Sequence, residues 1–353
     1  MPGNDLISIA QGGGKSHIIA EYAKAINEPV LILQPSRELV IQNRSKLLGC
    51  VPSEEIGIYS ASLNSKKVSK YTFATIGSIR HHVEDFKHFR TVIIDEAHLL
   101  NVKRQGSMLL SFLHAIGDPK CLGMTATPFR QCQMWVPSDG GVYEWDAVTT
   151  TKMINRMQPR FWNRLLYTIS TQELIDRGYL VPLSYINKKF IDQRNIPLNA
   201  SGSDFDLGEY ESMVSVAQNS YLIQLLEKSR DNFDSTLVFC SSVNQANFLG
   251  RSILGSEIVT AETSAKRRRK IIEGFKDGEI KMVLNVGCLT TGFDHPSLQV
   301  IFLLRPTRSI GLYLQMLGRG SRVAPGKKTC VVVDFTDTVN KLGPIESFKI
   351  EKV

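Results

Sequence analysis

Residues 6–26 read L-I-S-I-A-Q-G-G-G-K-S-H-I-I-A-E-Y-A-K-A-I: an apolar run, three consecutive glycines and an amphipathic stretch. The apolar run predicts a strand over Leu6–Ala10, and the stretch after the glycines predicts a helix over Ser16–Ile26. A strand that turns through glycines directly into a helix is typical of α/β folds that bind phosphate at the helix N-terminus.

The three glycines predict a phosphate cradle, because a residue without a side chain lets backbone N–H groups approach an anion closely. The strict G-x-x-x-x-G-K-[ST] pattern is not met, since Ile9 stands at its first glycine, but the shorter G-x-G-K-[ST] form is present. In this pattern the lysine reaches the β- and γ-phosphates of a nucleotide, and the serine hydroxyl holds Mg²⁺. The expected cradle residues are Gly12, Gly13, Gly14, Lys15 and Ser16.

Short apolar runs recur along the chain between longer amphipathic stretches such as Arg267–Phe275. Most are rich in Val, Ile and Leu, as strands buried in a parallel sheet are. Alternating strands and helices predict an α/β fold in which helices cover parallel sheets, and a length of 353 residues favours two domains. The predicted strands after the first are Val30–Gln34, Thr91–Ile94, Cys121–Met124, Ser235–Cys240, Lys281–Asn285, Val300–Leu304 and Thr329–Asp334.

The alternation breaks between Gln131 and Leu180, a stretch that holds all three tryptophans. We interpret this stretch as an inter-domain insert. The expected boundaries are therefore a first domain over 1–130, the insert over 131–180 and a second domain over 181–353. The aromatic and basic side chains of the insert could stack on bases at a DNA fork. The alternative, which carries more weight, is that the tryptophans pack the insert onto a domain.

The net charge of +8 and the pI near 9.1 favour a polyanionic partner, although a solvated Lys/Arg surface gives the same values. Both interpretations apply equally to the sharpest basic run, K-R-R-R-K at 266–270. The six cysteines include no C-x-x-C pair, which argues against zinc and for reduced thiols in the cytoplasm. We find no signal peptide and no apolar run long enough to span a membrane.

Two acidic residues follow the apolar run T-V-I-I, in the sequence Asp95-Glu96-Ala97-His98. Ligands bind at the carboxyl ends of the strands in an open parallel sheet, so both carboxylates should lie beside the phosphate cradle. One carboxylate can organise Mg²⁺, and the other can position and deprotonate an attacking water. Phosphoryl transfer requires both positioning and charge neutralisation.

Two further segments follow apolar runs. G-M-T-A-T-P-F-R at 123–130 offers hydroxyl residues that could sense the carboxylate loop, although an ordinary turn stopped by Pro128 is the stronger interpretation of this segment alone. Q-M-L-G-R-G-S-R at 315–322 places Arg319 and Arg322 on one face if it is helical. An arginine beside a γ-phosphate raises the rate of transfer by about 10³–10⁵. If these arginines and Lys15 belong to different domains, closing a cleft would switch hydrolysis on.

In order along the chain, G-G-G-K-S, D-E-A-H, T-A-T-P-F-R, T-T-G-F-D and Q-M-L-G-R-G-S-R resemble motifs I, II, III, V and VI of superfamily 2 helicases of the DEAH-box kind. The resemblance covers nearly the whole chain and implies two tandem RecA-like domains, with ATP and Mg²⁺ as cofactors. The second half is most similar to bacterial RadD helicases and phage UvsW-like DNA helicases. That closer likeness is carried by N-V-x-x-L-T-T-G-F-D, L-R-P-T, G-R-G-x-R and A-P-G-K.

The resemblance also implies a role for each matching residue of the nucleotide site. Asp95 would hold Mg²⁺ together with Ser16, and Glu96 would be the general base. Asp294 would lie near the nucleotide. The nucleotide would be coupled to the nucleic-acid path by His98, Thr125 and Thr127. The γ-phosphate would be contacted by Gln315, Arg319 and Arg322.

A second group of matching residues would hold the phosphate backbone of one nucleic-acid strand, through contacts that do not read sequence. These residues are Pro35, Ser36, Arg37, Thr75, Gly77, Ser78, Ser242 and Thr290. The sequence departs from the family at Gln11, where Thr is usual. Only nine or ten residues precede the cradle, which leaves no room for the family's adenine-reading glutamine. Either the chain begins late or adenine is held differently.

These observations lead us to expect ATP hydrolysis coupled to stepping along DNA, with strand separation or branch migration as the outcome. The expected partner is DNA as a single strand, a fork or a branched junction, and RNA is a weaker candidate. The expected state is a monomer in the cytoplasm of a bacterium or a phage-infected host. Two alternatives stay open: a duplex-DNA translocase that does not unwind, and a non-catalytic nucleic-acid clamp.

Overall fold

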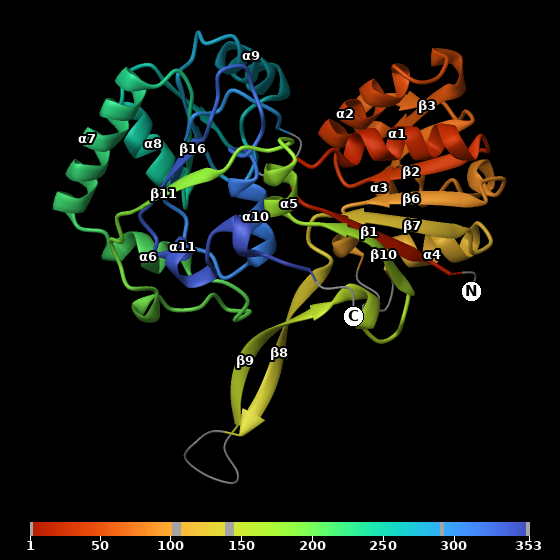
Figure 1. Cartoon of the computed structure of the whole chain (residues 1–353), viewed down its shortest axis with the longest axis horizontal. Helices are drawn as coiled ribbons and strands as arrows, with labels where there is room; N and C mark the ends of the chain where they lie inside the picture. Colours follow the sequence, from red (N-terminus) through yellow and green to blue (C-terminus); the bar gives the residue numbers. More distant parts are fainter. Residues whose placement is uncertain (1–2, 101–106, 138–144, 290–292, 351–353) are drawn as a thin grey trace. The chain divides into compact units, whose positions relative to one another are not determined.

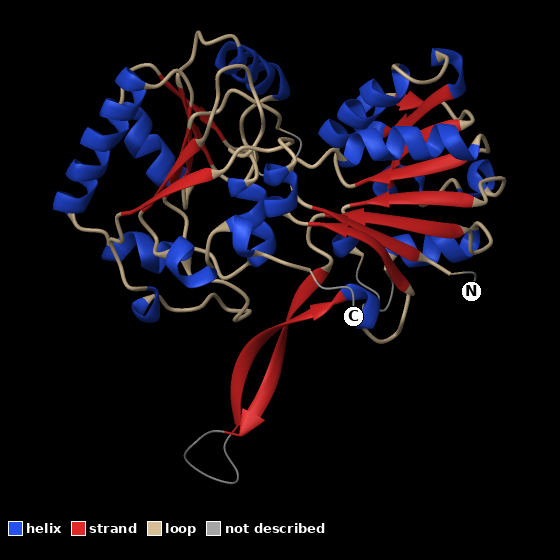
Figure 2. Cartoon of the chain, in the orientation of Figure 1, coloured by secondary structure: helices blue, strands red, loops and turns tan. Residues whose placement is uncertain are grey.

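The computed structural model describes residues 3–100, 107–137, 145–289 and 293–350, and the side chains of 132–149 lie outside that description. The chain divides into two compact units. Unit 1 comprises residues 1–10, 14–169 and 350–353, and unit 2 comprises residues 11–13 and 170–349. Each unit is a sheet with helices packed against it (Figure 1, Figure 2).

Unit 1 contains an eight-stranded sheet in the order β10-β1-β7-β6-β2-β5-β3-β4, parallel except for the last pair. Its strands are β1 (Asp5–Ile9), β2 (Val30–Gln34), β3 (Ile56–Ser60), β4 (Ser65–Lys66), β5 (Tyr71–Thr75), β6 (Thr91–Asp95), β7 (Lys120–Thr125) and β10 (Arg164–Ile169). Its helices are α1 (Lys15–Ile26), α2 (Arg37–Leu48), α3 (Ile76–Ile79) and α4 (Met108–Ala115).

Helices cover both faces of this sheet, because successive side chains of a strand point to opposite faces. Ile32 and Ile93 pack with α1 and α2 in one hydrophobic core. Leu31 and Val92, their sequence neighbours, pack on the other face with α4 and Trp162. The central strands therefore carry apolar residues towards both faces, at Val30–Leu33 in β2 and Val92–Ile94 in β6, as the sequence predicts.

Unit 2 contains a six-stranded, fully parallel sheet in the order β11-β16-β15-β12-β14-β13. Its strands are β11 (Leu183–Asn187), β12 (Thr236–Phe239), β13 (Ser256–Val259), β14 (Met282–Asn285), β15 (Val300–Leu303) and β16 (Cys330–Asp334). Its helices are α5 (Thr171–Asp176), α6 (Leu207–Met213), α7 (Val216–Asn232), α8 (Val243–Ser252), α9 (Ala265–Lys276), α10 (Ile310–Leu317) and α11 (Thr338–Leu342). Helices α9 and α10 pack on one face of the sheet and α7 and α8 on the other.

The eight strands predicted from apolar runs are all present, with each end within one residue of the prediction. The helices predicted at Ser16–Ile26 and Arg267–Phe275 are α1 and α9. Within the described residues, no helix is both long enough and apolar enough to cross a bilayer.

The stretch expected as an insert over 131–180 is not one piece. It begins within an antiparallel hairpin of β8 (Phe129–Pro137) and β9 (Trp145–Met153). Strand β10 then pairs in parallel with β1 at the edge of the unit 1 sheet, and α5 belongs to unit 2. The hairpin strands are the pair that extends from unit 1 in Figure 1.

Trp162 lies in the core of unit 1 with 1% of its surface exposed. A Cβ placed on Gly123 would lie 2.5 Å from the Trp162 ring, so only glycine fits below it. Packing is therefore confirmed for this tryptophan, and the idea that it stacks on DNA bases is wrong. The neighbouring Arg164, one of the basic side chains of this stretch, forms an ion pair with Asp5 at 2.8 Å. The side chains of Trp135 and Trp145 lie outside the described part.

Candidate nucleotide site and nucleic-acid contacts

The glycine cradle joins β1 to α1. Gly12 and Gly14 have φ of 84° and 89°, in the left-handed region that side chains rarely adopt. Gly14 is the N-cap of α1, and nothing within 4 Å would contact a Cβ built on it. The half-buried start of a helix, with open space above its cap, suits a phosphate group.

Asp95 ends β6, which follows β1 and β7 in the sheet, so its carboxylate lies on the same sheet edge as the cradle. Its Oδ2 accepts a hydrogen bond of 3.0 Å from Asn43 Nδ2 of α2, and its Oδ1 accepts one of 2.9 Å from the Glu96 amide. Burial raises the pKa of Asp95 to about 7, the charge of Glu96 adds to the increase, and the Lys15 charge opposes it. The Asp95 carboxylate is an oxygen donor of the kind that Mg²⁺ prefers, and the Lys15 charge that acts on it suits nucleotide phosphates.

Glu96 occupies an uncommon backbone conformation for a residue with a side chain. Its φ is 49°, which costs about 1–2 kcal/mol in an L-residue, and its surface is 5% exposed. The residue is thus held in a strained, buried position directly after Asp95. Strain of this kind persists where the surrounding structure over-determines the backbone, as at functional sites.

A chain of short contacts leads from Glu96 to the 123–130 segment. His98 Nδ1 lies 3.4 Å from the Glu96 carboxylate and 2.8 Å from Thr125 Oγ1, and the Thr127 amide donates to Thr125 Oγ1 at 3.0 Å. Burial lowers the pKa of His98, and the charges of Lys15 and Arg130 lower it further, against the opposing effect of Glu96. The structure therefore brings together the three residues expected to couple nucleotide and nucleic acid.

Arg130, at the root of the hairpin, adds a contact that the sequence did not predict. Its Nε and one terminal nitrogen both donate to the His98 carbonyl, at 2.8 and 2.5 Å. The carboxylate loop is thereby joined to β8. Asn43 is the other residue missed, because no motif marks an asparagine in the middle of a helix.

The expected nucleic-acid contacts of unit 1 lie at the ends of two adjacent strands. Strands β2 and β5 pair in register, Gln34 opposite Thr75, so the residues that follow them share a sheet edge. Ser36 caps α2 by accepting from the Leu39 amide, and the Thr75 and Ser78 hydroxyls lie 2.9 Å apart. The structure thus brings together Pro35, Ser36, Arg37, Thr75, Gly77 and Ser78.

In unit 2 the two arginines have partners within their own unit. Arg322 forms an ion pair of 3.0 Å with Asp294, and buried Arg319 donates to the Phe293 carbonyl. Gln315 lies half-buried on α10. Asp294, Arg319 and Arg322 therefore lie close together within unit 2.

Ser242 caps α8 by accepting from the Gln245 amide, and Thr290 lies outside the described residues. Three arginines of the basic run are engaged within unit 2: Arg267 pairs with Glu257, Arg268 donates to the Thr260 carbonyl and Arg269 pairs with Glu273. These contacts favour the solvated-helix interpretation of that run.

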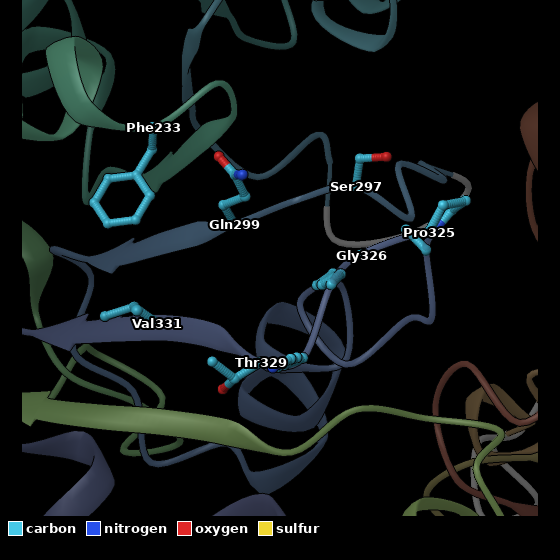
Figure 3. Close-up of a pocket in the computed structure, with 10 residues that line it drawn as sticks. Phe233, Ser297, Gln299, Pro325, Gly326, Thr329 and Val331 are labelled. Carbon is cyan, nitrogen blue, oxygen red and sulfur yellow. The ribbon is translucent and has the colours of Figure 1, made fainter.

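A hollow of about 430 Å³ in unit 2 is lined by Phe233, Gln299, Lys328 and Thr329 (Figure 3). Phe233, Gln299 and Thr329 precede β12, β15 and β16, so the hollow lies at the amino ends of the strands. The predicted site residues follow the carboxyl ends, where ligands of parallel sheets bind. The hollow is therefore separate from the predicted nucleotide and nucleic-acid residues.

Two family models match the chain. Residues 3–130 match the type III restriction enzyme res subunit, a range that holds the cradle and both carboxylates. Residues 217–324 match the helicase conserved C-terminal domain, a range that holds Asp294 and the two arginines.

The chain is similar to "Putative ATP-dependent helicase IRC3" of Saccharomyces cerevisiae, with 26% identity over 93% of this chain and 48% of that protein. It is also similar to "DNA 3'-5' translocase XPB2" of Sulfurisphaera tokodaii, with 22% identity over 89% of this chain and 74% of that protein. The chain spans about half the length of the first curated relatives it matches.

Among solved structures, S. cerevisiae Dbp5 bound to RNA and ADP BeF3 matches with a TM-score of 0.64 at 14% identity, over 100% of this chain and 86% of that chain. A likeness at this identity concerns the fold. The expected fold of two tandem RecA-like α/β domains is confirmed.

Proposed function

We propose that this chain is a DNA motor that couples ATP hydrolysis to movement along DNA, with unwinding or branch migration as the outcome. The two matched domains and the helicase relatives support an ATP-hydrolysing superfamily 2 helicase. Beyond that enzyme class, the proposal names DNA as the substrate and unwinding or branch migration as the outcome. Its main support is the contact chain from Glu96 through His98 and Thr125, with Arg130 joining the same loop to the hairpin.

In this proposal the cradle glycines, Lys15 and Ser16 bind the phosphates of ATP, and Asp95 holds Mg²⁺ with Ser16. Mg²⁺, when bound, would neutralise negative charge on the phosphates. Glu96 would position a water and accept its proton, and its strained backbone would fix the carboxylate for this task. Any change at Glu96 would reach the 123–130 segment through His98.

DNA is proposed over RNA because one relative is named a DNA translocase and the motifs are most similar to those of DNA helicases. The closer likeness to DEAH-box, RadD and UvsW-like enzymes belongs to the same proposal and rests on the motifs. We also propose that the protein is a monomer and that it acts in the cytoplasm. Cys50, Cys121, Cys240, Cys288 and Cys330 are free thiols, which fits a reducing compartment.

Replacing Lys15 tests the nucleotide site. We expect Lys15→Ala to lower DNA-stimulated ATP hydrolysis by at least about 10²-fold, because a positive charge on the phosphates is lost. Glu96→Gln should still bind ATP but hydrolyse it about 10²–10⁴-fold more slowly, because the base is lost. Hydrolysis is measured with single-stranded, duplex, forked and Holliday-junction DNA and with RNA.

Lys24→Ala is the matched control, since Lys24 is an exposed lysine on the same helix. Wild-type turnover in Lys15→Ala would contradict the assignment. A wild-type chain that binds DNA with strong salt dependence but hydrolyses no ATP would instead be the non-catalytic clamp.

A duplex translocase that does not unwind is the second candidate, favoured by the printed name of the Sulfurisphaera relative. Displacement of a third strand from a triplex measures translocation, and separation of a forked duplex measures unwinding. Activity in the first assay without the second would select the translocase.

A further inference from the structure

An acidic segment lies at the edge of the unit 2 sheet where β12 and β15 end. Residues 196–213 carry four carboxylates, Asp204, Asp206, Glu209 and Glu211, and no lysine or arginine, in a chain whose net charge is +8. The segment comprises a loop and α6, and it is anchored by a small separate cluster of Ile196, Phe205 and Tyr210. Two of the four carboxylates make specific contacts with the ends of strands.

Glu211 binds the two serines that follow β12. Its Oε2 accepts a hydrogen bond of 2.9 Å from the Ser242 hydroxyl, and its Oε1 accepts one from the Ser241 hydroxyl. Ser242 also accepts from the Gln245 amide as the cap of α8, so its single hydroxyl proton is directed to Glu211. Ser242 is the residue expected to hold a nucleic-acid phosphate.

Asp204 repeats this arrangement at the neighbouring strand. Its Oδ2 accepts a hydrogen bond of 2.8 Å from the Thr307 hydroxyl, and its Oδ1 accepts one of 2.7 Å from the Arg308 amide. Thr307 and Arg308 follow β15, which pairs in parallel with β12. The two carboxylates thus lie on the same edge of the sheet, each with both oxygens bound by a pair of donors.

We propose that the acidic segment is an internal mimic of nucleic-acid phosphates that must be displaced when DNA binds. A phosphate accepts hydrogen bonds from hydroxyl and amide groups through two oxygens, as each carboxylate does here. Both groups are negative, so a phosphate and Glu211 repel each other at these donors. This inference rests on the proposed function, since it assumes that the donors at this edge hold DNA.

The anchoring of the segment allows displacement. Its hydrophobic cluster is separate from the two cores that flank the unit 2 sheet. Segments with few buried contacts open at low free-energy cost while the rest of the domain stays folded. The free energy of displacing the acidic segment therefore prevents weak or isolated anions from binding at these donors.

Neutralising Glu211 tests the proposal. We expect Glu211→Gln to bind a single-stranded oligonucleotide about fivefold more tightly, because the hydrogen bonds to Glu211 that DNA must displace then involve a neutral acceptor instead of a charged one. The DNA concentration that half-maximally stimulates ATP hydrolysis should fall by the same factor. Glu209→Gln removes the same charge from an exposed position of the same helix. It should change the oligonucleotide affinity and the half-maximal DNA concentration by less than twofold.

A double-mutant cycle and an experiment on the wild type complete the test. Ser242→Ala should weaken DNA binding and remove the gain from Glu211→Gln. Hydrogen exchange of residues 204–211 in the wild type should speed up when the oligonucleotide is added, and this does not depend on a variant folding. Unchanged exchange together with equal affinities of Glu211→Gln and Glu209→Gln would make Glu211 a structural brace and overturn the inference. A wild type that neither binds DNA nor responds to it would overturn the proposed function instead.

Discussion

His295 is a buried histidine whose charge the fold disfavours. Its surface is 5% exposed, and its ring lies 4.7 Å from that of Phe275. Burial lowers the pKa of His295 to about 4, with the charges of Lys276 and Lys327 adding to the decrease and Asp294 opposing it. The unfolded chain therefore binds a proton near pH 6.5 that the folded chain does not bind until about pH 4.

This difference predicts a pH dependence of stability. The contribution of His295 is complete above about pH 6.5 and is lost as the pH falls towards 4, by up to about 3 kcal/mol. We expect His295→Phe to lose less stability than the wild type between pH 7 and pH 5, as measured by urea unfolding at each pH. His81→Gln, which removes an exposed histidine, should behave as the wild type does. Parallel pH profiles of wild type and His295→Phe would contradict the prediction.

Site residues that belong to a contiguous sequence motif could be predicted. Site residues that reach the site only through the packing of distant elements could not. The cradle and the Asp-Glu pair are contiguous in sequence, and the rule that ligands lie at strand ends places them on one edge. Asn43 binds Asp95 across 52 residues, through the packing of α2 beside β6. No spacing in the sequence indicates that contact.

Whether a strand could be predicted depends on how completely it is buried and on whether its apolar residues are continuous. Central strands such as β2 and β6 contain a continuous run of three or four apolar residues, because both faces of the sheet are covered. Among the missed strands, β10, β11 and β13 lie at sheet edges and are only partly buried, so they lack a continuous apolar run. For this reason β10 was predicted as part of an insert. Strands β3 (I-G-I-Y-S) and β5 (Y-T-F-A-T) lie inside the sheet and are mostly buried, but glycine, serine and threonine interrupt their apolar residues.

The hairpin of β8 and β9 is the element we expect to report the nucleotide state. Arg130 connects its root to the His98 carbonyl with two hydrogen bonds. Arg130→Ala should keep ATP binding and basal hydrolysis but reduce the stimulation by DNA at least about fivefold, because coupling between sites typically amounts to such factors. The measurement is ATP hydrolysis with and without single-stranded DNA. Lys120→Ala, an exposed charge on β7, is the control, and full stimulation in Arg130→Ala would show that this contact does not couple the sites.

At the scale of the whole molecule, the expected catalytic groups are divided between the two units. Lys15, Asp95 and Glu96 belong to unit 1, and Arg319 and Arg322 belong to unit 2. In the proposed function, hydrolysis requires an arginine at the γ-phosphate, whereas binding of ATP requires mainly the cradle residues. The Arg322–Asp294 ion pair of 3.0 Å would have to open for Arg322 to reach a phosphate.

Arg322→Ala should therefore separate the two steps. We expect ATP binding within a few-fold of wild type and a hydrolysis rate about 10³–10⁵-fold lower, because the charge that stabilises the transition state is lost. Binding is measured with a fluorescent ATP analogue and hydrolysis in a single turnover. Arg251→Ala removes an exposed arginine of α8 and should leave both unchanged. If Arg322→Ala reduced ATP binding and hydrolysis by the same factor, Arg322 would contribute to binding ATP and not specifically to the transition state. The proposed separation of ATP binding from hydrolysis would then be wrong.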